Sequence, residues 1–137
     1  MISPRTRTHA PVNSITRHRV LIGLLAMMSA FVAHASGPQT MKLEMQAQKN
    51  YFSENCFTLE RGQQLAYQVS TRHPIEFNLH HHRGDGAMVY PDKLVVKAKH
   101  SKTLIADSPG GYCFMATNLA DQPDGYEVVI HYEITAP

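Results

Sequence analysis

The part of the chain that decides the fold reads Ile75-Glu76-Phe77-Asn78-Leu79-His80-His81-His82. In an extended chain, successive side chains point to opposite sides, with a period of two. One side of this stretch therefore carries Ile75, Phe77, Leu79 and His81, and the other carries Glu76, Asn78, His80 and His82. This alternation predicts a half-buried β-strand with His80 and His82 on its outward side and His81 toward the core.

The same period extends over most of the remaining chain. Residues 41–48, 65–69 and 126–134 alternate most regularly, and shorter candidate strands cover 56–60, 87–90, 94–99, 102–106 and 112–117. Turns rich in Gly, Pro and Asp separate them, and Pro91-Asp92 is expected to divide 87–90 from 94–99. No window predicts an amphipathic helix. The pattern predicts an all-β fold, a two-sheet antiparallel β-sandwich, with a small β-barrel as the alternative.

The first 35 residues differ from the rest. Arg5, Arg7, Arg17 and Arg19 precede an uncharged run over 20–33, which ends at Ala33-His34-Ala35. This is the pattern of a cleavable secretory signal peptide over 1–35, followed by a single domain over 36–137. An uncleaved anchor is the alternative, but a span needs about 20 apolar residues. We therefore expect a periplasmic or extracellular protein with no membrane span after cleavage.

Charge excludes some partners. The whole chain has a net charge of +2, from 13 Lys and Arg against 11 Asp and Glu. Cleavage would remove the four leader arginines and leave 9 against 11, a net charge near −2. Nucleic-acid binding needs clustered cations, so this composition argues against a nucleic-acid partner.

Both cysteines, Cys56 and Cys113, lie in the part expected to be exported. An even number of cysteines in an oxidising compartment favours a disulfide, either between strands or between sheets; two unpaired buried thiols are the alternative. In the chain-entropy model a bond that closes this loop stabilises the fold by roughly 4 kcal/mol. It would also remove both thiols from nucleophilic catalysis.

Three short motifs resemble the GOLD (Golgi dynamics) domain over about residues 55–134. They are Cys56-Phe57-x-x-Glu60-x-Gly62, Ile75-x-Phe77-Asn78-Leu79, and Gly111-Tyr112-Cys113-Phe114 followed by Asn118. The resemblance implies a jelly-roll-like β-sandwich, often with a cysteine pair that joins the sheets, and a binding module instead of an enzyme. Unlike the cargo-receptor members, this chain is expected to have no coiled coil and no membrane span after its last strand.

The histidines are the main candidates for site chemistry. On a strand, His80 and His82 project to one side about 6–7 Å apart, which allows both imidazoles to reach one Zn²⁺ or Cu²⁺. Glu76, Asn78 and His131 are the residues that we expect to complete such a site. The alternative is a solvated polar face with no bound metal, and no other cofactor is expected.

Motifs typical of enzymes are missing from the sequence. It contains no Gly-x-Ser-x-Gly, no His-Glu-x-x-His and no glycine-rich phosphate loop. The sequence therefore predicts an exported, non-enzymatic binding module that contacts another protein or an envelope component. A periplasmic Cu- or Zn-binding protein that uses His80 and His82 is the first alternative, and a small secreted enzyme is the second.

Overall fold

The computed structural model describes residues 36–137, so the predicted signal peptide lies outside the described residues. Eight strands make up this region, and no described residue is helical. Their bounds are β1 (Ser36–Met45), β2 (Phe52–Leu59), β3 (Gln64–Ser70), β4 (Ile75–His82), β5 (Met88–Val96), β6 (Lys99–Ile105), β7 (Gly110–Asn118) and β8 (Tyr126–Thr135).

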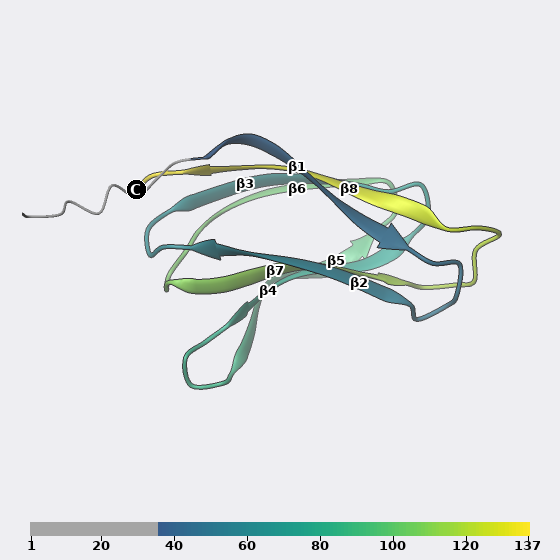
Figure 1. The fold of residues 1–137 in the computed structure, drawn as a ribbon, viewed down its shortest axis with the longest axis horizontal. Helices are drawn as coiled ribbons and strands as arrows, with labels where there is room; N and C mark the ends of the chain where they lie inside the picture. The colour runs from purple at the N-terminus through teal and green to yellow at the C-terminus, as the bar shows by residue number, and fades with distance from the viewer. Residues whose placement is uncertain (1–35) are drawn as a thin grey trace, which may run out of the picture. The chain divides into compact units, whose positions relative to one another are not determined.

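The strands form two four-stranded sheets that pack face to face (Figure 1). Sheet A has the order β1-β8-β3-β6, sheet B has the order β2-β7-β4-β5, and every pairing is antiparallel. This alternation of strands between two sheets is the order of an eight-stranded jelly roll. The predicted two-sheet β-sandwich is confirmed.

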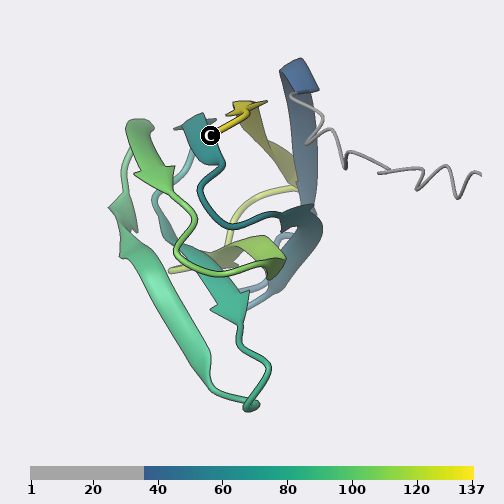
Figure 2. The same cartoon turned by 90° about the vertical axis from the view of Figure 1, so that its left-hand side faces the viewer.

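The core fills the space between the sheets. From sheet B the fully buried side chains include Leu59, Ile75, Phe77, Leu79 and Phe114, and from sheet A they include Leu43, Leu65, Val69, Val128 and Ile130. These are the apolar positions of the alternating patterns, because only every second residue of a strand faces the opposite sheet. Each sheet has a second face that points away from this core (Figure 2).

Pro91 does not end a strand, although the sequence analysis expected Pro91-Asp92 to separate two. Both residues lie inside β5, and the register with β4 is irregular between Leu79 and His81. β5 is an edge strand of sheet B, where one side of the backbone has no neighbouring strand. A proline is accommodated there because the missing N–H costs no hydrogen bond of the ladder.

The disulfide joins two strands of one sheet. Cys56 on β2 and Cys113 on β7 are directly opposite each other in the register of sheet B, and their sulfur atoms are bonded. The inter-strand alternative is therefore the one observed. The inter-sheet bridge that the GOLD resemblance implies is wrong for this chain, because both cysteines lie on the outer face of sheet B.

A buried polar cluster around Asp92 links the two sheets instead. The Asp92 carboxylate on β5 accepts hydrogen bonds from Tyr67, His100 (2.7 Å) and Lys102 (3.2 Å), all from sheet A. Burial tends to raise the pKa of the Asp92 carboxyl, but the three hydrogen bonds outweigh it and hold that pKa below its usual value. Burial and the Asp92 hydrogen bond raise the pKa of Tyr67 above its usual range, so Tyr67 stays a donor.

None of residues 36–137 belongs to a helix with the length and apolar character needed to cross a bilayer.

Candidate functional site

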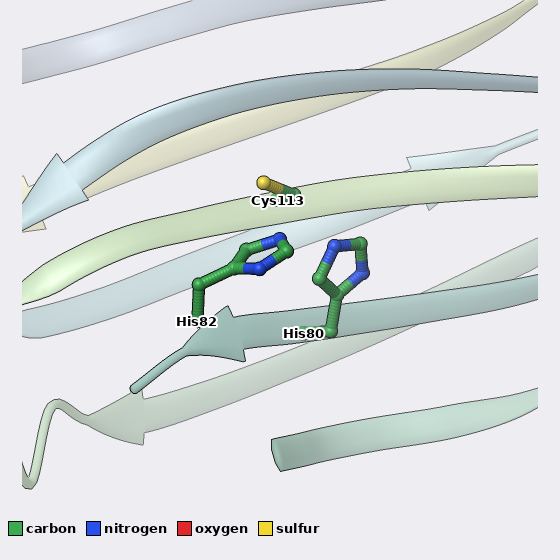
Figure 3. Close-up of side chains that lie close together, drawn as sticks. All are labelled: His80, His82 and Cys113. Carbon is green, nitrogen blue, oxygen red and sulfur yellow. The ribbon is translucent and has the colours of Figure 1, made fainter. Parts of the chain in front are cut away.

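The candidate site lies on the outer face of sheet B, where β4 approaches its end. His80 and His82 both project from β4 toward Cys113 on the neighbouring strand β7 (Figure 3). Their ring centroids are 5.0 Å apart with the rings nearly perpendicular. The prediction that both lie on one side of the strand agrees with this geometry. His81 points to the core, where its ring stacks on Tyr112 at 4.4 Å.

His80 is buried although it lies on an outer face, with 2% of its surface exposed. Its Nδ1 is 2.8 Å from Asn78 Oδ1. A carbonyl oxygen only accepts, so Nδ1 carries the proton of this hydrogen bond. In the neutral ring this leaves a lone pair on Nε2. Burial lowers the pKa of His80, with a smaller opposing effect from Glu54.

Glu54 on β2 is the nearest charged group to that nitrogen. Its Oε2 lies 3.3 Å from His80 Nε2, and its Oε1 lies 3.6 Å from Cys56 Sγ. The contact with His80 does not have the geometry of a hydrogen bond, because Nε2 is a buried side-chain atom with no hydrogen-bond partner. Among the described residues, the same holds only for Nε2 of His81. Buried polar atoms normally have a partner, so an orphaned one indicates strain or an absent ligand.

The disulfide lies beside these side chains, on the outer face of sheet B. One nitrogen each of His80 and His82 and the sulfur of Cys113 all lie within 4.8 Å of one another, as do donor atoms of Glu54, Cys56 and Cys113. Metal ions bind the thiolate form of cysteine, and both sulfurs are oxidised in the disulfide. The donors that remain are the two imidazoles and the Glu54 carboxylate.

The cluster, called here the His80 cluster (Glu54, His80 and His82 over the disulfide), is open to solvent on one side. His82 and Glu54 are both exposed, whereas Asn78, on the same side of β4 as His80 and His82, is 1% exposed. Tyr90 on β5 lies beside His80, with 5.9 Å between ring centroids. The cluster thus combines a buried ring nitrogen of His80, whose orientation is fixed by Asn78, with the exposed side chains of His82 and Glu54.

The other predicted site residues are placed differently. Asn78 belongs to the cluster through its hydrogen bond to His80, whereas Glu76 lies two residues further back and pairs with Lys93 at 3.4 Å. His131 is on β8 in sheet A, where its Nδ1 is 2.9 Å from Thr40 Oγ1. The structure does not bring His131 to His80 and His82, because the two histidine positions lie in different sheets.

Glu54 was missed by the sequence analysis. It lies two residues before Cys56, so it shares the outward side of β2 with that cysteine. Cys56 faces Cys113, which in turn faces His80 across β7 and β4. Had the two cysteines been known to lie on adjacent strands of one sheet, Glu54 could have been placed near His80. The sequence alone did not determine whether the disulfide joins two strands of one sheet or the two sheets.

A separate, open groove of about 690 Å³ lies on the outer face of sheet A. Thr40, Gln68, Ser101 and His131 form one row across the four strands at its base. These side chains are exposed and polar, and none of them is a buried atom without a partner. The groove contains less evidence of a specific ligand than the His80 cluster, so the cluster is the candidate site.

No protein-family model matches the chain, and no curated protein matches its sequence. Among solved structures, the chain is similar to PliG of Aeromonas hydrophila, a periplasmic lysozyme inhibitor of g-type lysozyme. The TM-score is 0.54 at 10% identity, over 72% of this chain and 86% of PliG. This likeness shows the fold. The resemblance to GOLD domains remains a prediction.

Two further structures overlap less closely. A protein of Sulfurospirillum deleyianum gives a TM-score of 0.47 at 11% identity, over 75% of this chain and 100% of that one. The Yersinia pseudotuberculosis-derived mitogen gives 0.45 at 11% identity, over 74% and 88%.

Proposed function

We propose that this chain is an exported, non-enzymatic binding protein that contacts another protein through the outer face of sheet B. The observation that carries the proposal is the exposure of large apolar side chains on that face. Phe52, Met88, Tyr90 and Val95 are 60%, 46%, 46% and 52% exposed. Phe52 lies on the edge strand β2 and the other three on the opposite edge strand β5. Large apolar side chains exposed on one face of a small domain are typical of a contact surface for another protein.

The outer face of sheet A is different. Its strands present mainly exposed polar and charged side chains, such as Thr40, Lys42, Gln68, Ser101 and His131. Ile105, at the end of β6, is the large apolar exception there. The outer face of sheet B also carries Glu54, Glu76 and Lys93. The contrast that favours sheet B as the binding face is its exposed Phe52, Met88 and Tyr90, because interface centres are enriched in aromatic residues and Met.

Export is supported by the disulfide and by the leader pattern of the sequence, because structural disulfides persist in oxidising compartments. PliG, which has the same fold, is a periplasmic inhibitor of a lysozyme, so at least one exported protein with this architecture acts on another protein. A binding role also fits the oxidised cysteines, which supply no free thiolate for nucleophilic chemistry.

Site-specific photo-cross-linking tests the proposal. A photoreactive amino acid is placed at Val95 on the outer face of sheet B or, as the matched control, at Ser101 on the outer face of sheet A. Both positions are exposed edge-strand residues. Cells that export the protein are irradiated, and purified g-type lysozyme is offered separately as a defined first partner. We expect a discrete protein adduct from position 95 and none from position 101.

Adducts of equal yield from both positions, or none from position 95, would reject sheet B as the contact face. A second variant, Val95→Lys, should suppress an adduct formed from position 52 on the same face, because it places a charge in the apolar surface.

A further inference from the structure

The His80 cluster contains an arrangement that contact with a protein does not explain. His80 Nε2 lies 3.3 Å from a carboxylate oxygen of Glu54 without the geometry of a hydrogen bond, and in the neutral ring that carries its proton on Nδ1 both atoms are acceptors. Two acceptors at this distance repel each other unless something positive lies between or beside them. The burial of Nε2 keeps bulk water from satisfying it.

The spacing of these two atoms fits a metal ion. In tetrahedral Zn²⁺ sites the metal–nitrogen and metal–oxygen bonds are about 2.0–2.2 Å, so neighbouring ligand atoms are about 3.3–3.5 Å apart. The distance of 3.3 Å between His80 Nε2 and Glu54 Oε2 corresponds to one edge of such a tetrahedron. A ring nitrogen of His82 lies within 4.8 Å of a ring nitrogen of His80, whereas ligand atoms of His80, His82 and Glu54 do not all lie within 4.8 Å of one another. The exposed side chain of His82 or Glu54 would therefore have to turn toward the ion when it binds.

Asn78 supplies the second feature of a metal site. Histidine ligands usually donate their other ring N–H to a neighbouring oxygen, which fixes the ring and directs the free lone pair at the metal. His80 does this toward Asn78 Oδ1 at 2.8 Å, and Asn78 is itself buried. The nitrogen that would bind the ion is thus held in place before any ion arrives.

We propose that His80, His82 and Glu54 together bind one divalent transition-metal ion of the Zn²⁺ or Cu²⁺ class on the outer face of sheet B. Two imidazoles and one carboxylate suit these ions better than Ca²⁺ or Mg²⁺, which prefer oxygen ligands only. The disulfide lies beneath the ion and contributes no thiolate. The position toward solvent stays open for water or for a group from a partner.

The inference does not depend on the protein-binding proposal. It concerns donor atoms of this chain alone, and its test contains no partner protein. Failure of one proposal would leave the other intact.

Calorimetric titration with Zn²⁺ tests it. Tag-free, oxidised protein is stripped with a chelator and titrated without thiol reductants, since free thiolates would add ligands of their own. The variants are His82→Ala and Glu54→Gln. Both wild-type side chains are exposed, so these substitutions should leave the fold intact. His131→Ala is the matched control, because it removes an exposed histidine from the opposite sheet.

We expect one ion per chain, a Kd raised at least about tenfold in each site variant, and an unchanged Kd in His131→Ala. The inference is overturned if the wild type takes up no stoichiometric zinc. It is equally overturned if either site variant binds like the wild type, or if His131→Ala loses as much affinity as His82→Ala, which would indicate adventitious uptake by surface histidines.

Discussion

Two partly buried groups of polar side chains, on opposite sides of sheet B, each contain a carboxylate and a histidine. They differ in how many of their polar atoms have hydrogen-bond partners. Between the sheets, the Asp92 carboxylate accepts hydrogen bonds from Tyr67, His100 and Lys102. On the outer face, His80 has a partner on Nδ1 but none on Nε2, and a carboxylate lies near it without a hydrogen bond.

The difference separates a structural group from a site. A buried charge whose hydrogen bonds are all made within the chain stabilises the packing it belongs to, and its loss is costly. A buried nitrogen that the chain leaves unpaired, beside the exposed side chains of His82 and Glu54, indicates a site. The Asp92 cluster therefore contributes to the packing of the two sheets, and the His80 cluster marks a candidate metal site on the outer face of sheet B.

Loss of the disulfide should have the largest effect on stability. Replacing Cys56 and Cys113 together by alanine removes a constraint on a loop of 57 residues and should lower the free energy of unfolding by about 4 kcal/mol. Urea unfolding followed by circular dichroism measures the change. A loss of less than about 1 kcal/mol would mean that the cross-link within sheet B contributes little and that the contacts between the sheets dominate.

Asp92→Ala should come next. It leaves Tyr67 and His100 without their acceptor, whereas Lys102 keeps its hydrogen bond to the Pro91 carbonyl oxygen at 2.7 Å. We expect the fold to be destabilised by about 3 kcal/mol, the lower end of the range for a broken buried pair, because Lys102 is partly exposed. The same urea titration measures it, and zinc affinity should not change. A stability close to that of the wild type would contradict the structural role of this cluster.

The stability of the fold at low pH should also depend on Asp92. The folded pKa of Asp92 is depressed, so its stabilising effect is present above the unfolded value of about 3.9 and is lost as pH falls through the folded pKa. Thermal unfolding between pH 6 and pH 2 should therefore show a steeper loss of stability in the wild type than in Asp92→Asn. Parallel curves for the two proteins would show that other carboxyl groups carry the acid sensitivity.

His131→Ala should have the smallest effect. The ring lies exposed on the polar face of sheet A, so stability should stay within about 0.5 kcal/mol of the wild type. A larger loss in urea unfolding would mean that its contact with Thr40 contributes more than an exposed hydrogen bond usually does.

The sequence predicted the parts of this account that depend on local alternation. The bounds of β4 and the opposite directions of His80 and His81 follow from the period of two. It did not predict what depends on strand order. Glu54 reaches His80 only because β7 lies between β2 and β4, and His131 is separated from them because β8 joins the other sheet. The Asp92 cluster was missed for the same reason, and Pro91 was misinterpreted because an edge strand cannot be recognised from its own residues.

The most direct test of the central claim is the protonation state of His80. Nuclear magnetic resonance of the ring nitrogens, in metal-free oxidised protein at neutral pH, distinguishes the two tautomers and the charged ring. The account predicts a neutral ring with its proton on Nδ1 and a bare Nε2. A proton on Nε2, in either the neutral or the charged ring, would contradict the account. It would mean that Nε2 already donates a hydrogen bond to Glu54 and has no lone pair with which to bind a metal ion.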